Sequence, residues 1–521
     1  MFQIKNVSFI HKKDLRTLLR GFSLTLSPGD KAVIIGEEGN GKSTLLKWIY
    51  SPPLVEDYIE AQGQRILSGE ALGYLPQELP LEDRGRTVYG YFAQEEQFLD
   101  LPYDDLRQLA AEAGLDTDFC YSDQKMSTLS GGEKIKAQLL RILMSRPTVL
   151  LLDEPSNDID LATLSWLEEL IRRWEGIVLF ISHDEVFIRN TANMVIHLEQ
   201  IHRKTESRCS VSRVDYARYL EERAHSFARQ EQQAVWERRE KRERDDKFRR
   251  IAQSVEHAQA SISRGDPHGG RLLKKKMHAV KSLERRFARE DEEMTEMPIA
   301  EMPIDVKLDP AVSAVPAGKT VLDFSLEKLT TPDGSRVLSQ NIHLLLRGSE
   351  KICIVGANGA GKTTLLREIA RELLPREDIR AGYMPQNYEE ELDLSMTPVD
   401  LLDTTGHREE RTKIRTFLGA LKYTTDEMDH PASELSGGQK AKILLLQLIL
   451  SGANVLILDE PTRNFSPLSG PVIRQLLAGF PGAVISISHD RAFISQVCDT
   501  VYRLSPEGLV KVEKEDAAPV L

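Results

Sequence analysis

Two segments of the form G-x-x-x-x-G-K-[ST], one in each half of the chain, constrain the fold more than any other feature. Apolar residues 32–35 and 352–355 precede them, and a helix-like run follows each. In that context the pattern predicts a strand, a loop whose backbone N–H groups converge on phosphate oxygens, and the start of a helix. The residues predicted to bind nucleotide in these loops are Gly36, Glu37, Glu38, Gly39, Asn40, Gly41, Lys42, Ser43, Thr44, Gly356, Ala357, Asn358, Gly359, Ala360, Gly361, Lys362, Thr363 and Thr364.

The motifs that follow each loop recur in the same order, which indicates a duplicated domain. Asp153 and His183 recur 306 residues later as Asp459 and His489, and a Leu-Ser-Gly-Gly motif recurs at the same offset. A constant offset over several motifs is the signature of an internal repeat. The loop lysines are 320 residues apart, so the first copy carries 14 extra residues, most of them before Gln77.

Apolar runs that end in polar motifs predict the fold class. Residues 149–152 and 455–458 end in Asp-Glu-Pro, and residues 178–181 and 484–487 end in Ser-His-Asp. Such runs are typical of buried parallel strands with functional groups at their carboxyl ends. We therefore predict an α/β protein with two tandem P-loop domains joined by an α-helical hairpin linker. The predicted parts are residues 1–205 and 321–521 for the two ATPase domains, 206–293 for the basic hairpin and 294–320 for an extended return segment.

The segment between the copies has helical spacing. Phe248, Ile251 and Val255 begin a narrow apolar seam, and residues 263–270 interrupt it with glycine and proline. The residues that resume it are Leu273, Met277, Val280 and Phe287. This spacing predicts two antiparallel helices that meet along the seam.

The side chains predicted to act on a bound nucleotide follow from these motifs. Lys42 and Lys362 are expected to contact the β- and γ-phosphates. A hydroxyl and a carboxylate in each copy are expected to hold Mg²⁺; these predicted metal ligands are Ser43, Asp153, Thr363 and Asp459. The glutamates that follow the two aspartates, Glu154 and Glu460, are the predicted general bases for the attacking water.

Two further motifs complete the predicted site. Gln77 and Gln386 each follow proline and are expected to sense the γ-phosphate through Mg²⁺ and water, and His183 and His489 are expected to bond a γ-phosphate oxygen. A serine followed by two glycines at the start of a helix is a second anion site. These residues are Ser130, Gly131, Gly132, Ser436, Gly437 and Gly438. Two domains facing head to tail could each close this second site over the other's ATP.

In this order, the phosphate loop, Gln, Leu-Ser-Gly-Gly, Asp-Glu-Pro and Ser-His-Asp resemble the ATP-binding cassette. Two cassettes with a charged helical linker on one chain are similar to the ABC-F subfamily. The resemblance covers roughly three quarters of the chain. It implies that each phosphate loop is completed by the Ser-Gly-Gly of the other copy. It also implies a translation factor that binds the ribosome near the tRNA exit site and reaches toward the peptidyl-transferase centre with its linker, in some members as protection against antibiotics.

The second copy departs from the family where the two cassettes communicate. The family usually reads Thr-Asn-His-Leu-Asp after Asp-Glu-Pro. Residues 156–160 keep the final Asp, as Asp160, whereas residues 462–466 end in Ser466. We therefore expect unequal coupling of the two sites.

The positive charge of the chain is concentrated in the predicted hairpin. The net charge is −12 overall, yet residues 221–290 carry 19 Lys and Arg against 12 Asp and Glu. Basic side chains at this density favour contact with rRNA and tRNA phosphates, although most charge runs are simply solvated. The predicted RNA-binding residues are Arg264, Arg271, Lys274, Lys275, Lys276 and Lys281.

The composition places limits on the setting. No run of about 18 apolar residues predicts a membrane span, the first residues lack a secretory signal, and four dispersed cysteines fit a reducing compartment. We therefore expect a cytoplasmic monomer whose two cassettes pair within the chain, with ATP and Mg²⁺ as cofactors and the ribosome as partner.

Two other functions remain open from the sequence. One is an ATP-gated DNA-binding or repair ATPase, although coiled coils in such proteins usually interrupt a cassette. The other is the ATPase subunit of a transporter with separate membrane chains, in which the basic hairpin has no use.

Overall fold

The computed structural model describes residues 2–13, 15–157, 159–201, 206–261, 267–292, 314–331, 333–463 and 465–514. It separates into two compact units, Met1–Tyr216 with Glu301–Leu521, and Ala217–Ala300. The first unit contains both copies of the predicted ATPase domain. Residues 293–313, which include most of the predicted return segment, lie outside the described part of the chain.

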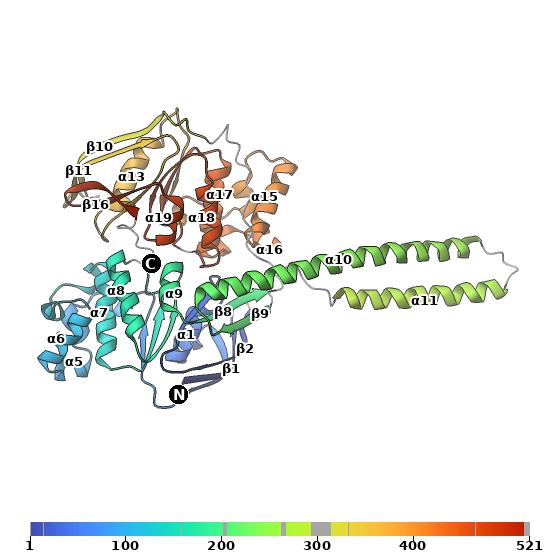
Figure 1. Ribbon diagram of the computed structural model, residues 1–521, viewed down its shortest axis with the longest axis horizontal. Helices are drawn as coiled ribbons and strands as arrows, with labels where there is room; N and C mark the ends of the chain where they lie inside the picture. Colours follow the sequence, from blue (N-terminus) through green and yellow to red (C-terminus); the bar gives the residue numbers. More distant parts are fainter. Residues whose placement is uncertain are drawn as a thin grey trace. The chain divides into compact units, whose positions relative to one another are not determined.

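A six-stranded sheet forms the centre of the first copy (Figure 1). In spatial order its strands are β5 (Leu72–Leu75), β6 (Val149–Asp153), β7 (Ile177–Ile181), β3 (Lys31–Gly36), β8 (Met194–Ile201) and β9 (Glu206–Ser212). Only β9 is antiparallel to its neighbour. Every residue of β6 and β7 is buried, so the apolar runs of the sequence are the interior strands.

The second copy repeats this sheet strand for strand. Its spatial order is β13 (Ala381–Met384), β14 (Val455–Asp459), β15 (Ala483–Ile487), β12 (Lys351–Val355), β16 (Thr500–Ser505) and β17 (Gly508–Val512). The strands that precede the phosphate loops, β3 and β12, lie in the middle of their sheets. The predicted α/β fold with two tandem P-loop domains is confirmed.

Eleven of the 14 additional residues of the first copy fall between Lys42 and Gln77, where the small antiparallel sheets of the two copies differ. In the first copy, β1 (Phe2–His11) pairs with β2 (Thr17–Leu26) and also with β4 (Ile59–Leu67). In the second copy, β10 (Thr320–Thr330) pairs with β11 (Val337–Arg347) in a two-stranded sheet. Strand β4 is thus built from the sequence that the second copy lacks.

Helices connect and cover the strands in both copies. In the first copy they are α1 (Lys42–Tyr50), α2 (Pro53–Glu56), α3 (Leu81–Arg84), α4 (Val88–Phe92), α5 (Glu96–Asp100), α6 (Tyr103–Glu112), α7 (Gly131–Met144), α8 (Leu161–Arg173) and α9 (Glu185–Thr191), with 3-10 turns η1 (Thr117–Tyr121) and η2 (Met126–Thr128). In the second copy they are α13 (Lys362–Leu373), α14 (Pro398–Leu402), α15 (Arg408–Ala420), α16 (Thr425–Asp429), α17 (Gly437–Leu450), α18 (Gly470–Ala478) and α19 (Arg491–Val497), with η3 (Tyr388–Glu390) and η4 (Ala432–Glu434). None of the described helices combines the length and apolar character needed to cross a membrane.

The two long helices between the copies are α10 (Tyr216–Ser261) and α11 (Pro267–Glu292), which run side by side (Figure 1). The rings of Phe248 and Phe287 meet edge to face with centroids 5.7 Å apart. The Arg244 guanidinium lies 4.4 Å from the centroid of Phe287. This packing confirms the predicted helical hairpin.

One residue of the predicted seam is misplaced. Ile251 is 51% exposed, whereas Val255 and Val280 are buried. The guanidinium of Arg244, one turn before Phe248, lies over the ring of Phe287 instead.

Truncation of the aromatic contact should loosen the hairpin. Phe287→Ala removes the partner of both Phe248 and Arg244, and we expect a local loss of about 1–3 kcal/mol because the site is only partly buried. Hydrogen exchange of the α11 amides would then be about 10–100-fold faster. The exposed Arg285 supplies the control, Arg285→Ala. Equal exchange in both variants would contradict the packing.

Candidate functional site

Each phosphate loop lies between the central strand of its sheet and a helix whose N-terminus lacks a side-chain cap. The loops join β3 to α1 and β12 to α13. Gly41 and Gly361 precede the helices with φ of 84° and 94°, and no side chain among the described residues caps either helix. A Cβ at Gly361 would come within 2.9 Å of Leu338. The free N–H groups therefore remain available to an anion.

The loop lysines lie across their own loops. Lys42 Nζ donates to the carbonyl oxygens of Gly36 and Glu37 at 2.8 and 2.9 Å, and Lys362 Nζ donates to those of Gly356 and Ala357 at 2.8 and 3.1 Å. Burial lowers the pKa of both ammonium groups. Phosphate oxygens would supply the negative charge that carbonyls only partly replace.

The residues predicted to hold Mg²⁺ lie together in both copies. Ser43 Oγ donates to Asp153 Oδ1 at 2.9 Å, and burial raises the pKa of Asp153 to about 6. In the second copy, burial raises the pKa of Asp459, partly offset by the Thr363 hydroxyl. Both Asp459 oxygens are buried without a well-formed hydrogen bond to any described residue.

A hydroxyl and a carboxylate fit Mg²⁺ only when further oxygens complete the shell. Within the described residues no group of three or more His, Cys, Asp and Glu side chains could hold a metal by itself. Mg²⁺ in nucleotide enzymes typically takes one or two protein ligands, with phosphate and water oxygens as the others. The pairs Ser43–Asp153 and Thr363–Asp459 fit this arrangement.

The two glutamates at the strand ends have a strained backbone. Glu154 and Glu460 adopt φ of 50° and 52°, a left-handed conformation that is uncommon for residues with a side chain. Their N–H groups donate to the carbonyl oxygens of Ile181 and Ile487 at 3.1 and 3.0 Å. Strain of this kind clusters at functional sites, and it recurs here at the equivalent position of each copy.

In the first copy, the two residues predicted to sense or bind the γ-phosphate, Gln77 and His183, contact the carboxylate of Glu154. His183 Nε2 lies 3.0 Å from its Oε1, and Gln77 Nε2 donates to its Oε2 at 3.3 Å. Asn157 also donates to this carboxylate. Burial opposes ionisation, but the hydrogen bond and charge of His183, together with Lys42, outweigh it and lower the pKa of Glu154 to about 2.

In the second copy, the corresponding carboxylate is less well satisfied. His489 Nε2 is 3.7 Å from Glu460 Oε1, and its backbone N–H donates to Oε2 at 3.4 Å. Burial, followed by the Asp459 charge, raises the pKa of Glu460, and burial lowers the pKa of His489 to about 3. Gln386, Glu460 and His489 all line one cavity. The two glutamates thus differ in electrostatic state.

The two Leu-Ser-Gly-Gly motifs form capped helix starts. Ser130 caps α7 in a capping box with Glu133, and Ser436 caps α17 in a capping box with Gln439. The adjacent glycines have no side chains that could shield their N–H groups, which suits an anion site.

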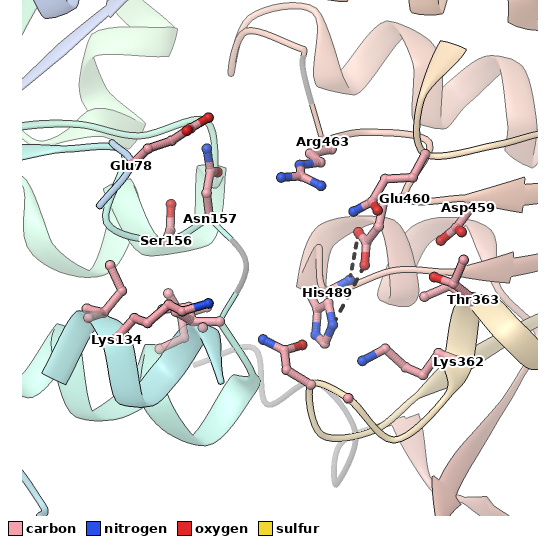
Figure 2. A pocket seen from close by; sticks show the side chains of 18 of the residues that line it. Glu78, Lys134, Ser156, Asn157, Lys362, Thr363, Asp459, Glu460, Arg463 and His489 are labelled. Carbon is pink, nitrogen blue, oxygen red and sulfur yellow. Dashed lines mark hydrogen bonds and ion pairs between the residues drawn. The ribbon is translucent and has the colours of Figure 1, made fainter. Parts of the chain in front are cut away.

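A cavity of about 880 Å³ joins the second phosphate loop to the first motif. Figure 2 shows Lys134 and Asn157 on one wall and Lys362, Glu460 and Arg463 on the opposite wall. Gly131, of the first Ser-Gly-Gly, also lines it. The volume is in the range of small-molecule sites. Sequence reasoning assigned no role to Lys134, which follows the first Ser-Gly-Gly, or to Arg463, which lies in the segment 462–466 that departs from the family.

The other composite site is closed by the chain itself. Gly438 N–H donates to Glu38 Oε2 at 2.9 Å, and Lys422 Nζ lies 3.5 Å from Glu37 Oε1. The remaining cavity there is about 40 Å³. A protein carboxylate therefore occupies the predicted anion site of Ser436–Gly438. The signal was present in the sequence, since Glu37 and Glu38 stand where the second loop has alanine and asparagine.

Comparisons with known proteins agree with this geometry. The family model described as ABC transporter matches residues 19–157 and 339–463, about half of the chain. The ribosome protection protein VmlR of Bacillus subtilis (strain 168) is 29% identical over 520 residues, 98% of this chain and 87% of VmlR. ATP-binding cassette sub-family F member 3 of Pongo abelii is 27% identical over 548 residues, 96% of this chain and 70% of that protein. The solved archaeal ribosome recycling factor aABCE1, in complex with the stalk protein aP1, has a TM-score of 0.57 at 16% identity, covering 97% of this chain and 89% of that chain.

Replacement of Glu38 should strengthen nucleotide binding at the first phosphate loop. Glu38→Asn installs the residue of the second loop, Asn358, and removes a carboxylate that competes for the Gly438 N–H. Hydrogen bonds to charged groups contribute about 1.5–3 kcal/mol, so we expect the dissociation constant of a fluorescent ATP analogue to fall about tenfold. The measurement uses a Lys362→Ala background, in which only the first loop binds.

The reciprocal variant is the matched control. Asn358→Glu, in a Lys42→Ala background, should weaken binding at the second loop. An unchanged affinity after Glu38→Asn would show that its carboxylate does not compete with nucleotide.

Proposed function

Because the chain belongs to the ATP-binding cassette family, and within it to subfamily F, we propose that it is an ATPase that binds the ribosome through its helical hairpin and leaves after hydrolysis. The carrying observation is the pair of composite sites, each built from the phosphate loop of one copy and the Ser-Gly-Gly of the other. An ATP at such a site lies between the two cassettes, so binding favours their closure and hydrolysis removes the γ-phosphate that supports it.

We propose these roles for the second site. Lys362 binds the β- and γ-phosphates, and Glu460 accepts a proton from the attacking water. His489 and Gln386 orient the γ-phosphate and that water. Thr363 and Asp459 would hold Mg²⁺, which would neutralise the charge that develops on the phosphoryl group of ATP.

The first site has equivalent residues, for which we propose the same roles. Lys42 binds phosphate, Ser43 and Asp153 hold Mg²⁺, and Glu154 is the base, with His183 and Gln77 already on its carboxylate. The Ser436–Gly438 motif completes this site once Glu38 has left it.

The charge of α11 supports the proposed ribosome contact. Lys274, Lys275, Lys276 and Lys281 are all exposed, which suits rRNA and tRNA phosphates. Arg264 and the side chain of Arg271 lie outside the described residues. The resemblance to VmlR, named as a ribosome protection protein, supports a ribosomal partner and makes antibiotic protection the first role to test. We further propose that the chain binds near the tRNA exit site, in the cytoplasm.

Blocked hydrolysis should trap the protein on ribosomes. In Glu154→Gln/Glu460→Gln, ATP still closes the cassettes but is not consumed, so we expect co-sedimentation of most of the variant with ribosomes in ATP, while the unmodified protein is released. Reversal of Lys274, Lys275 and Lys276 to Glu in that background should weaken retention and reduce the slope of log affinity against log salt by about 2–3.

The sedimentation result, together with three further measurements, decides between the candidate functions. Free sedimentation of the double Glu→Gln variant in ATP would refute ribosome binding, and tighter binding to branched DNA would revive the repair function. Co-purification with a membrane protein would favour the transporter subunit. Drug susceptibility of cells expressing the unmodified protein then separates antibiotic protection from a housekeeping role.

The two sites should respond differently to pH. A general base acts only when ionised, and burial raises the pKa of Glu460, so its ionised fraction grows as pH rises through that raised value. Glu154, with a pKa of about 2, is ionised at every working pH. Single-turnover hydrolysis by Glu154→Gln should therefore increase about tenfold from neutral to alkaline pH, and that by Glu460→Gln should stay level. Identical profiles would contradict the assignment.

A further inference from the structure

Two buried ion pairs join the first copy to the second, away from the phosphate loops. Arg491 on α19 donates to Glu168 on α8, and their side chains are 3% and 4% exposed. Arg474 on α18 lies 2.5 Å from Glu185 on α9, with side-chain exposures of 4% and 11%. These pairs are nearly dry, unlike the solvent-exposed ion pairs elsewhere on the chain.

The four residues occupy only two positions of the duplicated fold. Arg474 lies 306 residues after Glu168, and Arg491 lies 306 residues after Glu185. This is the offset of the catalytic motifs. The first copy thus carries a carboxylate at both positions, and the second copy carries a guanidinium at both.

Amide side chains at a third duplicated position hold the pairs in place. Asn190 Nδ2 donates to Glu168 Oε2 at 3.2 Å, and Arg474 Nε donates to Gln496 Oε1 at 2.7 Å. Gln496 also lies 306 residues after Asn190. Both pairs are therefore built from equivalent parts, with the charges distributed by copy.

The distribution of charge determines which copies can pair. If two first copies met through this surface, Glu168 of one would face Glu185 of the other. Two second copies would bring Arg474 against Arg491. Like charges buried against each other are strongly unfavourable, so only a first copy against a second copy brings each of the four groups against an opposite charge.

We propose that these four residues select the partner of each cassette, so that the first half accepts the second half and rejects another first half. The selected partner is the other half of the same chain, since the linker keeps it at a high effective concentration. The device is continuous with the ATP sites. Asp184 and Asp490 each line the large cavity and lie 3.9 Å from Arg491 and Arg474 respectively. The proposal does not depend on ribosome binding.

Charge reversal in the full-length protein tests this selection. Glu168→Arg/Glu185→Arg makes all four positions basic, and Arg474→Glu/Arg491→Glu makes all four acidic. We expect either reversal to reduce ATPase activity at least about tenfold, because breaking a buried pair is costly. The quadruple variant restores opposite charges and should recover to within about threefold of the starting activity.

Mixing separates partner selection from simple stabilisation. We expect the all-basic and all-acidic chains to have little activity alone, but each offers the surface that the other needs. An equimolar mixture should regain ATPase activity and form a two-chain complex by mass photometry, whereas neither chain alone should. The control is Glu169→Arg, which reverses a neighbouring, partly exposed charge on α8 and should leave activity unchanged.

Several results would overturn the proposal. One is a folded quadruple variant that is as inactive as the two reversals, and another is a mixture that gains nothing. If the reversals do not fold, neutral variants decide instead. Glu168→Gln and Arg491→Gln each remove one partner of a buried ion pair, so the double variant should be more active than either single variant. A double variant that is weaker than both singles would refute the pairing.

Discussion

The nucleotide sites depend on one electrostatic constraint: the helix N-terminus in each Ser-Gly-Gly motif must face an anion across the boundary between the two copies. The N-terminal N–H groups of a helix carry partial positive charge and have no partner within the helix. In one composite site Glu38 provides that anion by accepting from Gly438. In the other, the cavity beside Gly131 remains open. In the proposed function, a γ-phosphate would satisfy the same donors with more charge and would thereby make closure of the copies responsive to nucleotide.

The two sites share a backbone and differ in electrostatics. Glu154 and Glu460 have nearly the same left-handed φ, so the strand end presents both carboxylates alike. Asn157 donates to the first, while the position 306 residues later is Arg463, which lines the cavity as a charge. The first carboxylate is therefore held ionised by neutral and histidine donors. The second is buried with Asp459 as its neighbour and has a raised pKa. A duplicated fold has thus kept its geometry while its proton affinities diverged.

The fold and most of the site residues could be predicted because their signals are local. The phosphate loops, the buried strands and the Ser-Gly-Gly caps each lie within a few consecutive residues, and parallel sheets bring strand ends to one edge. The contact of Glu38 with Gly438 joins residues 400 positions apart, and no spacing rule reaches that far. The positive φ of Glu154 cannot be predicted from its residue type, because glutamate rarely adopts this conformation. Ile251 was misplaced because helical spacing identifies a face but not which side chains its partner covers.

The charge pairs show what duplication permits. Between two identical copies, an interface of this kind is self-complementary, so each copy must carry both members of every pair. Two first copies would face Glu168 with Glu185, which no identical dimer could bury. Segregation of carboxylates to one half and guanidinium groups to the other is possible only where the halves can change independently on one chain. The linker gives the second half a high effective concentration at the first half. Because the two halves are thereby joined on one chain, their contact surfaces need not be identical. The surfaces can instead carry complementary charges that exclude a second copy of either half.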